Sequence, residues 1–199
     1  MTGVAFARTA RAVREGLDQQ HRYAHVVRAA RMAELLARAH RVDPFRARLA
    51  GMLHDLARLY SAERLLRECA ERGMPVDAFE RANPVVLHAR LGAELARERF
   101  GVEDEGVLSA IRKHTLADAV MSPLDEVVFL ADGLEPGRDF ADRAELAALA
   151  FRDRRAAMRA VLASSVLYLK RNGLAIAPQT RAAAERYGAA IPLEERTPA

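Results

Sequence analysis

The chain has 199 residues with a formal net charge of +4, and 51% of them are hydrophobic, which suits one globular domain with a sizeable core. No apolar run reaches the about 18 residues that cross a bilayer, and the first residues do not resemble a secretory signal, so we expect a cytoplasmic protein without membrane contacts. Because Cys69 is the only cysteine, an intrachain disulfide and a cysteine-based zinc knuckle are excluded.

The first half of the chain shows apolar residues at spacings of three and four, the pattern of amphipathic helices. One such stripe runs through 25–40. After it, Asp43 is expected as the N-cap of a helix, with Pro44 at the first helical position and the helix continuing through 45–57. Ser61 is expected to cap the next helix, which stops at a glycine.

The second half continues the same pattern. Pro84 is expected to open a helix that closes at Gly101, and Ser122 is expected to cap another with a proline at its first position. The helices predicted in this half cover 84–100, 104–114, 123–132, 141–151, 153–171 and 178–188.

These elements predict an all-α fold, a single compact helical domain with a site among its helix ends. Only 127–131, "VVFLA", resembles a strand, and the capping residues around it favour a helix. We expect a helix within 1–19 that packs on the core, the main domain over 20–175, and a C-terminal helix with a loose tail over 176–199.

Histidines and aspartates recur at positions that otherwise look buried. His54 and Asp55 are adjacent inside an apolar run, where an unpaired carboxylate is costly and is normally paired or bound to a metal. A single residue of this kind is more often a core or surface residue than a ligand, but the interior of a helical bundle is where such proteins build metal sites. The candidate ligands are His25, His54, Asp55, His88, His114 and Asp132.

The types of these six side chains indicate which metal ions the site would bind. Four imidazoles and two carboxylates suit iron, manganese or zinc better than magnesium or calcium. One carboxylate flanked by imidazoles can bridge two ions about 3.5–4 Å apart, an arrangement used to hydrolyse phosphate esters. Asp55 is the candidate for that bridge.

A rival motif is the pair His21 and His25, whose spacing of four is that of a helical zinc pair. The zinc proteases need a glutamate directly after the first histidine, and Arg22 occupies that position, so this function is rejected. His21 and His40 are expected at helix ends on the surface, His40 compensating the helix dipole.

The order of the six candidate ligands along the chain resembles the H…HD…D signature of the HD-domain metal phosphohydrolases, with the two extra histidines of members that hold two metals. The segments "RYAH", "HDLAR", "LHARLGA", "IRKHT", "MSPLDEVVFLAD" and "LEPGR" resemble the successive motifs of the YqeK-type proteins, bacterial symmetrical diadenosine tetraphosphate hydrolases. The resemblance spans about residues 20–185. The sequence departs from the family pattern at Val26, Arg58, Lys113 and the pair Leu116-Ala117.

This resemblance implies an enzyme that cleaves diadenosine tetraphosphate into two ADP molecules at two metal ions, iron first, with manganese or zinc as alternatives. It assigns one ion to His25, His54, Asp55 and Asp132, and the other to Asp55, His88 and His114. The metals lower the pKa of a shared water, so that hydroxide attacks phosphorus. Asp55 and Arg58 are assigned to catalysis.

The substrate is expected to be held mainly by guanidinium groups, which match the geometry of phosphate. Glu135 is expected either to hold a nucleotide or to orient Arg138, and a plain ion pair between these two residues is the alternative. The candidate substrate-binding residues are Arg22, Arg58, Thr115, Glu135 and Arg138.

Three other functions stay open: another HD-family nucleotide hydrolase, a non-catalytic nucleotide-binding protein, and a basic RNA-binding helical protein. The chain lacks the Glu-Asp pair that follows the HD pair in alarmone hydrolases and the Gly-Tyr-Pro of the cyclic dinucleotide type. Its arginines are dispersed among acidic residues, which favours a solvated surface over nucleic-acid binding. The oligomeric state stays open, a homodimer included.

Overall fold

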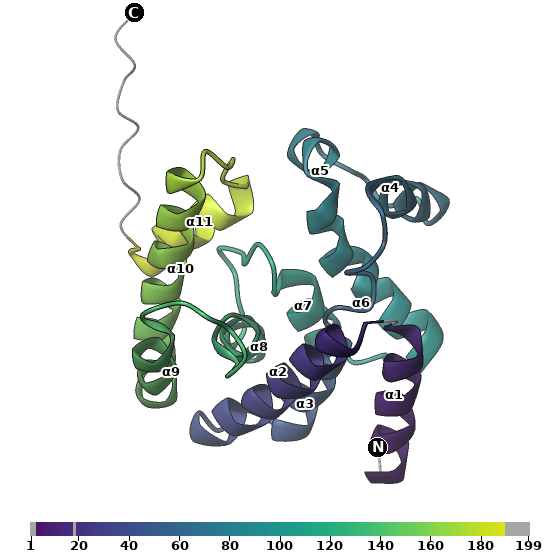
Figure 1. The fold of residues 1–199 in the computed structure, drawn as a ribbon, viewed down its shortest axis with the longest axis horizontal. Coiled ribbons are helices and arrows are strands. Elements are labelled where there is room, and N and C mark those ends of the chain that lie inside the picture. Colours follow the sequence, from purple (N-terminus) through teal and green to yellow (C-terminus); the bar gives the residue numbers. More distant parts are fainter. Residues whose placement is uncertain (1–2, 18, 190–199) are drawn as a thin grey trace, which may run out of the picture.

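The computed structural model describes residues 3–17 and 19–189. Within these residues it contains eleven α-helices, one 3-10 helix and no strand, which confirms the expected all-α class (Figure 1). The first six helices are α1 (Gly3–Gly16), α2 (Gln20–Ala39), α3 (Pro44–Leu53), α4 (Ala62–Glu71), α5 (Ala78–Ala82) and the 3-10 helix η1 (Pro84–Val86). The remaining six are α6 (Leu87–Phe100), α7 (Glu105–Lys113), α8 (Pro123–Leu134), α9 (Arg143–Arg152), α10 (Arg154–Arg171) and α11 (Pro178–Tyr187).

The predicted caps explain where three of the helices begin. The Asp43 carboxylate accepts hydrogen bonds from the first main-chain N–H groups of α3, and the Ser61 hydroxyl accepts one from the first turn of α4. Ser122 forms a capping box with Asp125 at the start of α8. These side chains satisfy N–H groups that have no partner within the helix.

Two predicted helices differ from the structure. The helix expected over 45–57 ends at Leu53, because the following N–H groups bond to the carbonyl three residues back, as Leu56 does to Leu53 and Arg58 to Asp55. His54 and Asp55 therefore lie in a tight turn directly after α3 rather than inside it.

The helix expected from Pro84 also begins differently, with one 3-10 turn before α6. The short helix α5 before it was not predicted. Asp77 and Glu80 form a capping box there, a spacing that is visible in the sequence.

Helix α8 lies at the centre and contacts α2, α7 and α10, so it connects the two sides of the molecule (Figure 1). Glu126 of α8 is buried, pairs with Arg154 of α10 and accepts a 2.5 Å hydrogen bond from the Tyr187 hydroxyl of α11. At the other end of the chain, the Phe6 ring of α1 packs edge-to-face on the Phe45 ring of α3, with 6.3 Å between the ring centroids. The first and last helices thus pack on the same core.

Two further expectations concern the ends of the chain and the membrane. The loose C-terminal tail lies outside the described residues, and the domain boundaries at 19/20 and 175/176 stay predictions. Among the described helices, none combines the length and apolarity needed to cross a membrane.

The close crossing of α2 and α3 brings two parts of the site together. A β-carbon at Gly51 of α3 would lie 2.8 Å from the Cα atom of Ala30 in α2, a backbone atom that cannot move aside easily. The small residues at this crossing let the two helices approach, and His25 of α2 then lies beside His54 after α3.

We expect Gly51→Ala to lower the free energy of unfolding by about 1–3 kcal/mol, because the added methyl group overpacks this crossing. Urea unfolding measures the change. Gly16→Ala is the matched control, since no atom beyond the chain neighbours and the backbone of its own helix lies within 4 Å of the added carbon. Equal stability of Gly51→Ala and the wild type would contradict the close crossing.

Candidate metal centre

The six predicted ligands lie in one cluster between five helices. α2 supplies His25, the turn after α3 supplies His54 and Asp55, and α8 supplies Asp132. The first turn of α6 and the first residue after α7 supply the two remaining histidines. All are buried except the Asp132 side chain, which is 18% exposed.

Three of the histidines are oriented in the same way. Each donates its Nδ1–H to the main-chain carbonyl three residues earlier, because a carbonyl can only accept. This bond leaves Nε2 free to face the cluster. The distances are 2.8 Å from His54 to Gly51, 2.5 Å from His88 to Val85 and 2.8 Å from His114 to Ile111.

Asp55 lies between two groups of imidazoles. Its Oδ2 atom is 3.7 Å from Nε2 of His25 and 3.6 Å from Nε2 of His54. Its Oδ1 atom is 3.4 Å from Nε2 of His88 and 3.8 Å from Nε2 of His114. Each oxygen of one carboxylate thus faces a different pair of histidines.

Asp132 completes the side of the cluster that contains His25. Its Oδ1 atom lies 3.1 Å from Nε2 of His25 and 3.6 Å from Nε2 of His54. Burial raises the pKa of the Asp132 carboxyl, but its hydrogen bond with His25 and the neighbouring positive charges outweigh this and hold the pKa well below its usual range. The same contact raises the pKa of His25 against the opposing effect of burial.

The protonation states of His114 and Asp55 suit metal binding. Burial, together with the charges of His54 and His88, lowers the pKa of His114 to about 3, so its imidazole is neutral at pH 7 and keeps a free lone pair. Burial raises the pKa of Asp55, but His54 and His88 outweigh it and keep this carboxyl ionised.

Neutral imidazoles and ionised carboxylates are the donors that divalent transition metals require. Within the described residues, the ligand atoms form three groups in which all atoms lie within 4.8 Å of one another. The groups are His25, His54 and Asp55; His54, His114 and Asp132; and Asp55, His88 and His114. The donor set therefore fits divalent metal ions.

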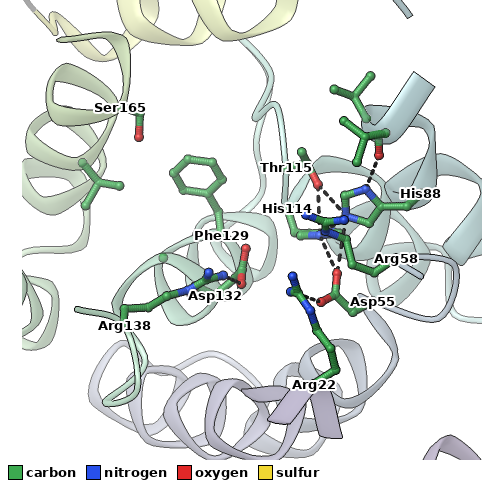
Figure 2. A pocket seen from close by; sticks show the side chains of 14 residues that line it. Arg22, Asp55, Arg58, His88, His114, Thr115, Phe129, Asp132, Arg138 and Ser165 are labelled. Carbon is green, nitrogen blue, oxygen red and sulfur yellow. Dashed lines mark hydrogen bonds and ion pairs between the residues drawn. The ribbon is translucent and has the colours of Figure 1, made fainter. Parts of the chain in front are cut away.

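A cavity of about 310 Å³ opens directly onto this cluster. Arg22, Arg58 and Arg138 line it together with Thr115 (Figure 2). The Thr115 Oγ1 atom is 3.2 Å from Nε2 of His88 and 3.0 Å from Nε2 of His114. The cavity therefore combines three guanidinium groups with the candidate metal ligands.

Two of these arginines already contact the carboxylates. Arg138 donates a 2.5 Å hydrogen bond from Nη2 to Oδ1 of Asp132 and a 2.9 Å bond from Nε to the Asp132 carbonyl. Arg22 Nη1 lies 3.8 Å from Oδ2 of Asp55. Arg58 lines the cavity from the turn after α3.

A second, largely apolar cavity of about 700 Å³ adjoins the first and shares residues such as Thr115, Phe129 and Ser165 with it. Figure 2 shows Phe129 between the polar cluster and Ser165 on α10. Phe140 and Tyr168 also line the apolar cavity. The polar cavity thus adjoins an apolar one.

Glu135 was predicted to contact the substrate, but its side chain lies outside the cavity. Helix α8 ends at Leu134, and the extended backbone of Glu135 turns its side chain toward α2. The carboxylate is 1% exposed, is not part of the cavity lining, and bonds to Arg28 and His25 instead of the Arg138 guanidinium. Among the described residues, Glu135 thus lies behind a histidine rather than in the cavity.

The sequence did not single out Arg28. It follows His25 by three residues, which places both on one face of α2, but nothing distinguishes this arginine from the many others in the chain. Of the two histidines assigned to the surface, His21 is exposed, whereas His40 is partly buried with Nε2 2.6 Å from the carbonyl oxygen of Ala150.

Comparison with known proteins agrees with this geometry. The model of the HD domain family matches residues 22–137. The symmetrical bis(5'-nucleosyl)-tetraphosphatase of Bacillus subtilis is 32% identical over 81% of this chain and 86% of that protein. The protein of the same name from Halalkalibacterium halodurans is 33% identical over 82% of this chain and 87% of that protein.

A solved structure is also similar. The crystal structure of a protein from Clostridium acetobutylicum, described as a "predicted HD superfamily hydrolase involved in NAD metabolism", superposes with a TM-score of 0.87. The two sequences are 28% identical, and the superposed region covers 92% of this chain and 96% of the other protein.

Proposed function

Because the chain belongs to the HD-domain family of phosphohydrolases and is related to the bacterial symmetrical bis(5'-nucleosyl)-tetraphosphatases, we propose that it hydrolyses diadenosine tetraphosphate to two ADP molecules. The observation that carries this proposal is the position of Asp55, whose two oxygens face separate pairs of histidines at the base of an arginine-lined cavity.

In this proposal the cluster would hold two divalent ions. His25, His54, Asp55 and Asp132 would hold one of them, and Asp55, His88 and His114 would hold the other. Iron is the first choice and manganese or zinc are the alternatives, because imidazole and carboxylate donors suit all three. When bound, such ions lower the pKa of a water molecule and neutralise charge on a phosphoryl group.

The cavity residues would bind and orient the polyphosphate. Arg22, Arg58 and Arg138 present guanidinium groups that can each form paired hydrogen bonds to phosphate oxygens. Thr115 offers a hydroxyl between His88 and His114. The oxygen of water bonds to one of the two central phosphorus atoms, the bond from that phosphorus to the central bridging oxygen breaks, and the second ADP leaves with that oxygen. The protons of the water pass to the two new terminal phosphates or to solvent.

The apolar cavity supports a nucleotide rather than inorganic polyphosphate as the substrate. A base and ribose need an apolar surface with a few polar groups, and the adjoining cavity of about 700 Å³ offers Phe129, Phe140 and Tyr168 together with Asn83 and Ser165. In this arrangement one nucleoside lies in the apolar cavity while its phosphates reach the polar one.

The proposal is tested by incubating metal-reconstituted protein with diadenosine tetraphosphate, nucleoside mono- and triphosphates and an alarmone. We expect diadenosine tetraphosphate to be hydrolysed with the highest kcat/KM. Preference for a mononucleotide or alarmone would reassign the substrate within the family, and hydrolysis of none of them would favour a nucleotide-binding protein without catalysis.

In the same assay, Arg58→Ala is expected to lower kcat/KM by about 10- to 100-fold, the loss of one charge-assisted contact with phosphate, without changing the metal content. Arg67→Ala is the matched control, because its side chain is exposed on α4 outside both cavities. A change in metal content in Arg58→Ala would place Arg58 among the groups that support the metals.

A further inference from the structure

His25 differs from the other three histidines of the cluster in what lies behind its ring. His54, His88 and His114 each place Nδ1 against a main-chain carbonyl. His25 instead places Nδ1 3.1 Å from the Oε1 atom of the Glu135 carboxylate. A carboxylate behind a ligating imidazole fixes the ring and makes its free nitrogen a stronger donor than a carbonyl does.

The Glu135 carboxylate is itself held in place. Arg28 donates to it from Nε at 2.5 Å and from Nη2 at 3.1 Å, and the main-chain N–H of Gly137 donates at 2.6 Å. A β-carbon at residue 137 would lie 2.1 Å from Nη2 of Arg28, so a glycine there leaves the room that the guanidinium occupies. Burial raises the pKa of Glu135, but the bonds from Arg28 and His25 outweigh it and lower the pKa to about 2.

The charges on the two sides of the cluster are also unequal. Oxygens of Asp55 and Asp132 lie 3.7 and 3.1 Å from Nε2 of His25, whereas His88 and His114 form their ion pairs with Asp55, and an oxygen of Asp132 lies within 4.8 Å of a ring nitrogen of His114. Donor strength and negative charge therefore both favour the side of His25.

We propose that Glu135 is a positioning residue that acts through His25, and that it makes the two metal positions unequal. The ion on the side of His25 binds tightly, and the ion held by Asp55, His88 and His114 exchanges readily. This inference rests on the two-metal centre of the proposed function but not on the identity of the substrate.

The test is a titration of metal-free protein with Mn²⁺, followed by the electron paramagnetic resonance signal of unbound Mn²⁺. We expect two binding steps in the wild type. Glu135→Gln keeps the shape but removes the charge, and should weaken the tight step about 10- to 100-fold, the usual effect of losing a group behind a ligand, while the weak step stays unchanged. Glu135→Asp restores the charge and should recover part of the affinity.

Two further variants separate positioning from general damage to the fold. Arg28→Gln frees the Glu135 carboxylate and should weaken the same step to a smaller extent. Arg31 lies on the same helix as Arg28, and its side chain is 63% exposed. The control variant Arg31→Gln should therefore change neither metal-binding step. Thermal unfolding of the metal-free variants checks that each is folded.

The inference is overturned if Glu135→Gln and Arg28→Gln bind the first Mn²⁺ as the wild type does, or if they weaken both steps equally. A wild type that takes up a single Mn²⁺ or none overturns the two-metal centre itself. Because the readout is metal binding, a wrong substrate assignment leaves this result intact.

Discussion

Asp55→Ala is expected to lose both metal ions and nearly all activity. Asp55 is the residue whose two oxygens face both pairs of histidines, so its removal takes an anionic donor from each position. The loss of metal-assisted charge stabilisation corresponds to about 3–5 kcal/mol of the barrier, roughly 10²- to 10⁴-fold in rate. Elemental analysis of anaerobically purified protein gives the metal content per chain, and initial rates give the activity.

Two comparisons make this result specific to the bridge. Asp55→Asn keeps the shape and removes the anion, so it should show the same loss if charge is the cause. Asp132→Ala should lose only the ion on the side of His25, because Asp132 contacts His25 and His54 on that side. If Asp55→Ala retains two ions, the bridge is assigned to the wrong residue.

The second large effect is expected from His88→Ala and His114→Ala. Each removes an imidazole whose ion pair is with the Oδ1 atom of Asp55, so the second ion should be lost and the first largely kept. We expect activity to fall about 10²- to 10³-fold, since one of two ions no longer contributes to the reaction. Metal content near one ion per chain, with a folded protein by circular dichroism, is the expected measurement.

His21→Ala is the matched histidine control. His21 is exposed on α2 and lies outside the three ligand groups, so this variant should keep both ions and full activity. Wild-type protein that reaches full activity with one bound ion per chain in total, the readily exchanging position included, would contradict the two-metal account, whatever the variants show.

The sequence predicted the fold class and the helix starts well because both depend on local physics. Capping side chains such as Asp43 and Ser122 act within one turn of the residues that reveal them. The end of α3 was placed four residues too late, because the apolar spacing continues after Leu53 although the hydrogen bonds change to the three-residue pattern.

The convergence of the six candidate ligands could be expected from their residue types and order. Their exact partners could not, since these depend on contacts between segments far apart in the chain. The partner of Glu135 is one example. Arg138 is only three positions further along the chain, which suggested a local pair, yet the turn after α8 directs the Glu135 side chain to Arg28, 107 residues earlier.

The departures from the family pattern show the same limit. Lys113 has a structural role that its sequence position does not reveal, because its Nζ atom donates to the carbonyl of Val120 and to the Asp125 carboxylate. Ala117 adopts a φ of +57°, a conformation that a glycine adopts without strain. Lys113 thus links α7 to the segment before α8, and neither Lys113 nor Ala117 lines the polar cavity.

The position of bond cleavage tests the central claim most directly. If the pocket holds an ADP unit with its second phosphate over the metal-binding cluster, hydrolysis of diadenosine tetraphosphate gives ADP alone. If it holds only an AMP unit there, attack shifts by one phosphate and gives AMP and ATP. Chromatography of the earliest products from metal-reconstituted protein distinguishes these outcomes: the account predicts ADP as the only nucleotide formed, and equal amounts of AMP and ATP would contradict it.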